Sequence, residues 1–162
     1  MAEAYRVERI AVAAEPLVDP GYDYADSFQA RLAQPDAHTA EQWARTCLEE
    51  AAPAVRRLVR FVHARVARFE LSADPGSVLG WQVLSSTPQA LHLRTEGSML
   101  RAEIVARRTS PTTSGFSTYL FYKRPATRLL WMGVGPLHRA VAPYLLRRAA
   151  AALTSRQGVS QP

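Results

Sequence analysis

The chain has 162 residues, of which 48% are hydrophobic and 21% charged, values typical of one folded domain rather than of a disordered chain. Its apolar runs fall short of the roughly 20 residues of a membrane-spanning helix, and its charged start is unlike a secretory signal. The net charge of +6 comes almost wholly from dispersed arginines without aromatic stacking positions or a recognisable reading helix, so nucleic-acid binding is not expected. The single cysteine, Cys47, excludes an internal disulfide, and together these features predict a cytoplasmic protein.

The first part of the chain predicts a strand followed by two helices. Residues 7–14 form the first ordered element, which is either a helix or a strand. Residues 24–32 alternate as a strand does, with Phe28, Ala30 and Leu32 facing inward. Thr39 and Gln42 have the spacing of a capping box, which opens a short helix ending near residue 50. Pro53 begins a second helix, because proline is tolerated in a first turn. An apolar stripe follows the second helix at Val55, Leu58, Val59, Val62, Val66 and Phe69.

From residue 78 onward the hydrophobic period changes from about 3.6 to about 2, which predicts strands. The expected strands are residues 78–84, 90–96, 99–108 and 116–123, with a polar loop at residues 109–115. The connections between them are too short for parallel crossovers, so the sheet is antiparallel. Glu96, Arg101 and Glu103 are expected to form a solvated charge ladder on the outer face.

Residues 127–153 return to helical spacing, and Pro136 and Pro143 predict either a kink or a strand-like entry. The prediction is therefore one α+β domain over residues 1–154, followed by a flexible tail at residues 155–162. A curved antiparallel sheet wraps around the long C-terminal helix, with two short helices inserted after the early strands. Because a twisted sheet cannot close flush along a whole helix, an apolar cavity is expected between them.

Two segments carry a resemblance to a known family. Residues 129–139 read Leu-Leu-Trp-Met-Gly-Val-Gly-Pro-Leu-His-Arg, and residues 79–81 read Leu-Gly-Trp. These motifs resemble those of a bacterial domain family of uncharacterised function that is also found fused to short-chain NAD-dependent epimerase-like domains. The resemblance covers residues 24–150. The element order resembles the helix-grip superfamily, which includes START lipid-transfer domains and polyketide cyclases. The chain lacks the Gly-x-Gly-x-x-Gly motif of dinucleotide binding, so no cofactor is expected.

His138 and two tryptophans are the first candidate site residues. His138 follows Pro136, and its imidazole can face the cavity as an acid, a base or a hydrogen-bond donor. Alternatively, it can form a hydrogen bond to a backbone carbonyl that the proline leaves free, and this structural role is favoured. Trp131 lies seven residues earlier and shares its helical face. Trp81 can line a pocket for a flat or apolar ligand, although tryptophans also fill cores, as expected of Trp43.

The strands supply three more candidates. Tyr119 and Tyr122 lie on opposite faces of the last strand, so only one can point inward. Asp26 alternates in phase with Phe28, which makes it a possible buried carboxylate, although a position in solvent at the strand end is favoured. The catalytic candidates are thus His138, Tyr122 and Asp26. The ligand-binding candidates are Trp81, Tyr119, Trp131 and His138.

Other chemistry is not expected. The four histidines are scattered without metal-ligand spacing, and His63 is expected to be exposed among arginines. Cys47 falls on an apolar helical face, where an inert core thiol is expected.

The sequence favours a protein that binds a lipid-like or polycyclic apolar small molecule in the cavity. A polyketide cyclase-like or dehydratase-like enzyme is the first alternative. It requires two titratable groups that converge at the cavity. A protein-interaction domain with a collapsed pocket is the second alternative, and the oligomeric state stays open.

Overall fold

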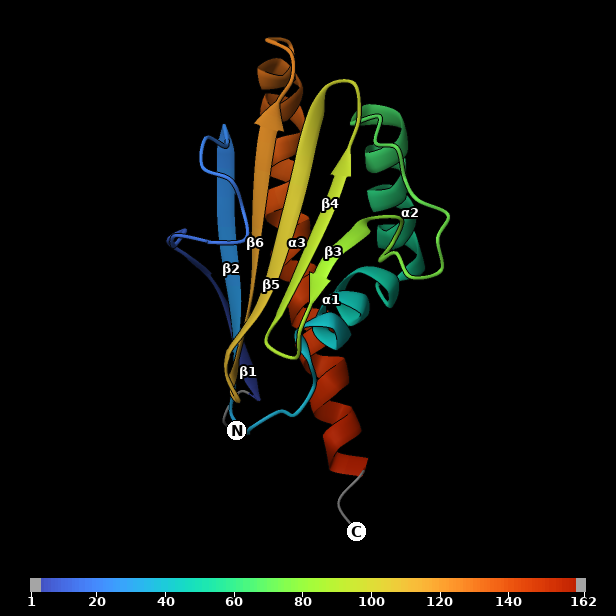
Figure 1. The fold of residues 1–162 in the computed structure, drawn as a ribbon. Helices are drawn as coiled ribbons and strands as arrows, with labels where there is room; N and C mark the ends of the chain where they lie inside the picture. The colour runs from blue at the N-terminus through green and yellow to red at the C-terminus, as the bar shows by residue number, and fades with distance from the viewer. Residues whose placement is uncertain (1–3, 160–162) are drawn as a thin grey trace.

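The computed structural model describes residues 4–159 and has the predicted α+β architecture (Figure 1). Six antiparallel strands form one curved sheet in the order β1-β2-β6-β5-β4-β3. The strands are β1 (Tyr5–Ile10), β2 (Tyr24–Leu32), β3 (Gln82–Ser86), β4 (Ala90–Glu96), β5 (Leu100–Ser110) and β6 (Thr113–Tyr122). The long helix α3 (Thr127–Val159) crosses one face of the sheet, and α1 (Ala40–Glu49) and α2 (Pro53–Phe61) follow β2.

The helix starts follow the predicted signals. The Thr39 hydroxyl accepts a hydrogen bond from the Gln42 backbone, and the Gln42 side chain accepts one from the Thr39 backbone, so the capping box of α1 is present. Pro53 occupies the first turn of α2. The second helix does not continue regularly to Phe69, because a π-helical segment, η1 (Val62–Val66), follows α2.

Three predicted boundaries are wrong. The third strand begins at Gln82, because residues 78–81 form a tight turn with mutual backbone hydrogen bonds between Val78 and Trp81. The polar loop expected at residues 109–115 is mostly strand, because β5 and β6 pair up to Ser110 and Thr113. The last helix runs unbroken through Pro136 and Pro143 to Val159, beyond the predicted helix end at residue 153 and into residues 155–162, the expected tail. The rest of that tail, residues 160–162, lies outside the described residues.

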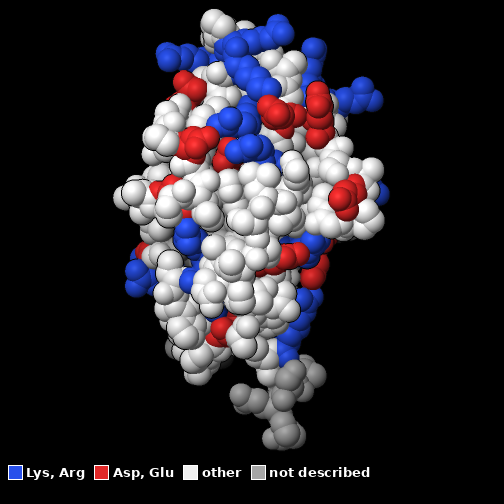
Figure 2. All heavy atoms as spheres, viewed as in Figure 1, with Lys and Arg blue, Asp and Glu red and all other residues white. Residues whose placement is uncertain are grey.

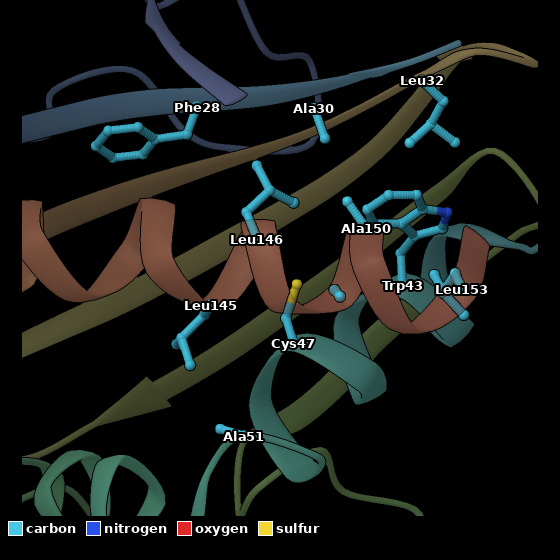
Figure 3. Close-up of a cluster of buried hydrophobic side chains, with 11 residues drawn as sticks. Phe28, Ala30, Leu32, Trp43, Cys47, Ala51, Leu145, Leu146, Ala150 and Leu153 are labelled. Atoms are coloured by element: carbon cyan, nitrogen blue, oxygen red, sulfur yellow. The ribbon is translucent and has the colours of Figure 1, made fainter. Parts of the chain in front are cut away.

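The C-terminal half of α3 is buried against β2 and α1 (Figure 3). Leu146 and Leu153 of α3 are 2% and 1% exposed, and they share this core with Phe28 and the fully buried Trp43. Cys47 is buried here as well, and burial raises the pKa of its thiol, as expected of an inert core cysteine. The N-terminal half of α3 is different, because its Leu129 is 72% exposed.

The buried carboxylate of Asp36 anchors the C-terminal end of α3. It accepts hydrogen bonds from Trp43 Nε1 of α1 at 2.6 Å and from Gln157 Nε2 of α3 at 2.8 Å. Arg108 of β5 forms an ion pair with it at 3.1 Å, and His38 contacts it too. These bonds join one end of α3 to the sheet, so any space between helix and sheet lies toward the other end.

The connection between β1 and β2 folds across the outer face of the sheet. Its Val18 is 8% exposed and packs with Val105 and Tyr119. The predicted charge ladder is on this face, but Glu103 is fully buried rather than solvated. The Glu103 carboxylate is 2.7 Å from His92 Nε2, and it forms ion pairs with Arg94 and Arg101 at 3.0 and 3.1 Å. Burial of this carboxylate is tolerated because the surrounding groups pair it.

Candidate functional site

An apolar cavity of about 150 Å³ lies between the sheet and the N-terminal half of α3, and the helices α1 and α2 with η1 close its side. Its floor consists of inward-facing residues of β2, β5 and β6, and its roof of one face of α3. The main lining residues are Phe28, Leu58, Val59, Val62, His63, Phe69, Trp81, Leu100, Ala102, Ile104, Phe116, Thr118, Leu120, Leu130, Trp131, Val134, Leu137, His138, Val141 and Ala142. Among these side chains, only Thr118 and the two histidines carry polar groups other than indole N–H.

One side of the cavity is loosely covered. None of the residues of α2 or η1 is fully buried, although Leu58, Val59, Val62 and His63 all line the cavity. Leu58 of α2 and Leu137 of α3 are lining residues that are 39% and 37% exposed. The cavity therefore opens between α2 and α3. A helix with so little buried surface can move at low cost, and π-helical segments such as η1 often occur at functional sites.

His138 lines the cavity and is held from behind by a buried carboxylate. His138 Nε2 is 3.1 and 3.2 Å from the two oxygens of Asp26, which is 1% exposed. The Tyr24 hydroxyl donates a hydrogen bond of 2.7 Å to the same carboxylate. The favoured solvent position of Asp26 is therefore wrong, because its phase with Phe28 brings it to the helix side of β2. The carbonyl predicted to hold His138 is likewise replaced by Asp26.

Asp26 stays ionised in this setting. Burial raises the pKa of its carboxyl, but the hydrogen bond and positive charge of His138, helped by the Tyr24 hydrogen bond, lower the pKa below its ordinary value overall. Burial and the hydrogen bond to Asp26 raise the pKa of the Tyr24 hydroxyl. An ionised Asp26 accepts the Nε2 proton of His138, so Nδ1 is the ring nitrogen of His138 that remains for a ligand.

His63 is the second titratable group at the cavity. Trp81 Nε1 donates a hydrogen bond of 3.4 Å to His63 Nδ1. Burial, together with charge on His138, lowers the pKa of His63 to about 4. His63 is thus neutral near pH 7, and its proton is on Nε2, so it is a hydrogen-bond donor. The prediction of an exposed His63 is wrong.

The Leu79-Gly80-Trp81 segment places Trp81 at the cavity. Leu79 and Gly80 both have positive φ, at 50° and 86°, as the two central residues of a tight hairpin turn require. A Cβ on Gly80 would lie 2.9 Å from the Leu71 Cβ, which is too close. This turn presents Trp81, which is 3% exposed, between Phe69 and His63 with ring centroids 5.7 and 5.5 Å away.

The Trp131 segment builds the opposite wall. The Trp131 ring lies 5.3 Å from the His138 ring and 4.9 Å from the Tyr24 ring, measured between centroids. A Cβ on the buried Gly135 would lie 3.2 Å from Trp131 Nε1 and 3.1 Å from Arg139 Nη1. Glycine at this position therefore lets the indole lie against α3, which explains the glycine four residues after Trp131.

The structure separates the predicted site residues into two groups. Trp81, Trp131 and His138 line the cavity, and Asp26 contacts His138. Tyr119 does not belong to the site, because it faces the opposite side of the sheet beneath the β1–β2 connection, where it is 2% exposed. Tyr122 lies on the opposite face from Tyr119, as the alternation of side chains along β6 requires, and so faces the helix side. It is not one of the residues that line the cavity.

Two site residues were missed at the level of sequence. His63 lies four residues after Val59 of the apolar stripe, and that spacing places the two side chains on one face. Tyr24 lies two residues before Asp26 on the same strand face, so the alternation that marked Asp26 also marked Tyr24.

Comparisons of the chain with protein-family models, with curated proteins and with solved structures found no match. Within residues 4–159, no group of three or more His, Cys, Asp or Glu side chains is arranged to hold a metal ion. Over the same residues, the helices lack the combination of length and hydropathy needed to cross a bilayer.

Proposed function

We propose that the protein binds an apolar small molecule in the cavity between the sheet and α3. The observation that carries this proposal is an apolar cavity of about 150 Å³ that opens between α2 and α3. A cavity of this order accommodates a benzene-sized molecule, whereas pockets for larger ligands usually measure about 300–1,000 Å³. A one-ring compound fits the cavity as it stands, and a lipid-like or polycyclic ligand requires α2 to move outward.

The two histidines define the polar part of the ligand. His63 offers an Nε2 donor, and His138, in its neutral form, offers an Nδ1 acceptor on the cavity wall. A ligand with one carbonyl oxygen and one hydroxyl group, attached to an apolar ring, satisfies both. The arrangement of elements also supports membership of the helix-grip superfamily, and we propose a cytoplasmic location.

A filled cavity tests this proposal. Ala142 lines the cavity, whereas Ala140 is exposed on the same helix, so Ala142→Phe and Ala140→Phe form a matched pair. Isothermal titration with phenol, 4-hydroxyacetophenone and 1-naphthol measures binding to the full chain. We expect Ala142→Phe to weaken binding of the best ligand at least tenfold and Ala140→Phe to leave it unchanged. Equal binding by both variants, or binding of none of the probes to the wild type, argues against the cavity as a ligand site.

A second candidate function is acid–base catalysis on a bound carbonyl compound, as in a cyclase or dehydratase. The specific observation in its favour is the Asp26–His138 pair at an otherwise apolar wall. His138 Nδ1 can remove a proton from the carbon next to a carbonyl, and the His63 N–H can donate to the oxygen on which negative charge develops. The cavity gives less support to an interaction domain, because that hypothesis assumed a collapsed pocket.

Proton exchange distinguishes binding from catalysis. If His138 is a base, the methyl protons of bound acetophenone exchange with deuterium oxide faster than in buffer, as followed by nuclear magnetic resonance. A positioned general base contributes about 10²–10⁴-fold, so His138→Gln should abolish most of the acceleration. Bound acetophenone without accelerated exchange supports binding alone.

A further inference from the structure

Several large apolar side chains on α2 and α3 are exposed, and two of them line the cavity. We call Leu58 and Phe61 of α2 and Leu129 and Leu137 of α3 the apolar rim. Their exposed fractions are 39%, 58%, 72% and 37%. Leu58 and Phe61 are three residues apart on one helical face, and Leu58 and Leu137 both line the cavity. Leu58 and Leu137 thus extend the apolar cavity surface to the outside of the molecule, and Phe61 and Leu129 add exposed apolar surface on the same two helices.

The two segments that carry the rim contain only basic charges. Residues 52–69 contain five arginines and no Asp or Glu, and so do residues 127–159. Arg57, Arg60 and Arg65 are exposed, and none of them forms an ion pair with another described residue. Figure 2 shows Lys and Arg side chains gathered at the end of the molecule where β6 ends and α3 begins, with some acidic side chains beside them. The rest of the visible face mixes both signs.

We propose that the apolar rim docks on the surface of an anionic lipid bilayer. Leucine and phenylalanine enter the boundary between headgroups and acyl chains, and arginines beside them pair with acidic headgroups. A nucleic acid requires the arginines but gives no reason for four exposed apolar side chains. Docking places the opening of the cavity against the acyl region, so an apolar ligand passes between membrane and cavity without crossing water. Docking itself does not require a ligand, and it is independent of the proposed binding function.

Vesicle sedimentation with the full chain tests the proposal. The probes are vesicles of phosphatidylcholine alone and vesicles in which phosphatidylglycerol replaces part of it. We expect sedimentation with the mixed vesicles, little with phosphatidylcholine alone, and release as salt is raised. Each arginine near an anionic surface contributes about fivefold in affinity, so Arg60→Glu should weaken binding by at least that factor. Arg9→Glu on β1 is the charge control.

The apolar contribution has its own matched pair. Phe61→Ser combined with Leu129→Ser should reduce binding to mixed vesicles about tenfold or more, because two large side chains no longer enter the bilayer. Leu84→Ser on β3, where the native side chain is 38% exposed, should change nothing. Equal binding by all variants, or no sedimentation with anionic vesicles, overturns the proposal.

A dimer in light scattering that the Phe61→Ser and Leu129→Ser changes dissociate would assign the rim to a second copy of the chain and overturn the proposal. If a variant fails to fold, the salt dependence and lipid selectivity of wild-type binding still decide whether the chain docks on an anionic bilayer. Ala142→Phe should bind vesicles normally, so failure of ligand binding and failure of docking are distinguishable.

Discussion

Removal of the Asp26 carboxylate should destabilise the fold and reveal how the site holds His138. Asp26→Ala deletes two charge-assisted hydrogen bonds, from Tyr24 at 2.7 Å and from His138 at 3.1 Å. Such bonds contribute about 1.5–3 kcal/mol each, but their loss also ends the cost of keeping a carboxylate buried. We therefore expect the free energy of unfolding to fall by about 2–4 kcal/mol. Asp26→Asn keeps the shape and the acceptor for Tyr24, so it should cost about 1–2 kcal/mol.

The effect should depend on pH in a defined direction. The folded-state pKa of Asp26 lies below its ordinary value of 3.8, so its ionised form contributes stability above that pH. This stability is lost as the pH falls through the lower, folded-state pKa. The difference in unfolding free energy between wild type and Asp26→Asn should thus be constant at moderately acidic pH and shrink below about pH 4.

Urea unfolding followed by tryptophan fluorescence measures this difference at each pH. Asp19→Asn is the control, because Asp19 is exposed and should show no such dependence. A difference that stays constant or grows on acidification would falsify the assignment of an ionised Asp26 beside His138.

Three further changes have defined outcomes in the same unfolding assay. Asp36→Ala should cost about 3–5 kcal/mol, because it leaves the buried partner Arg108 without its carboxylate; a cost below about 1 kcal/mol would contradict its anchoring role. Gly80→Ala should cost about 1–3 kcal/mol because of its positive φ and close approach to a neighbour, whereas Gly133→Ala, with open space around it in α3, should stabilise by about 0.5–1 kcal/mol. The wild type should lose stability between pH 6.5 and about 4, because the folded state resists protonation of His63 while the unfolded state accepts it. The variant His63→Phe should reduce this loss by roughly 2 kcal/mol. Parallel pH profiles for wild type and His63→Phe would show that His63 is not buried at the cavity.

Local signals predicted the elements well where short-range chemistry determines them. The capping box of Thr39 and Gln42 needs only neighbouring backbone groups, and Pro53 needs only a first turn, so both helix starts are correct. The alternation of residues 90–96 also matches β4, because one face of that strand contacts the core throughout. The predicted boundaries at residues 78–84 and 109–115 are wrong. The two-residue turn at Leu79 and Gly80 sets the first, and pairing between β5 and β6 sets the second.

The candidate site shows the same division. Periodicity placed Trp131 and His138 on one helical face and Asp26 in phase with Phe28, and the structure agrees with both placements. The alternation of side chains along the last strand also placed Tyr119 and Tyr122 on opposite faces of the sheet, but it could not say which of them faces the helix. The exposed position expected of Asp26 and His63 was wrong, because burial depends on what covers a residue rather than on its own spacing.

By itself, the sequence determined the α+β class, the antiparallel strands, the long C-terminal helix and the apolar character of the surfaces between them, because hydrophobic periodicity and turn chemistry are local properties. Only the tertiary structure decided that His138 meets Asp26, that His63 meets Trp81, and that space remains beneath the N-terminal half of α3. These contacts join residues from 18 to 112 positions apart, and their existence depends on side-chain packing across the sheet and helices. Pattern and spacing carry no information about such packing.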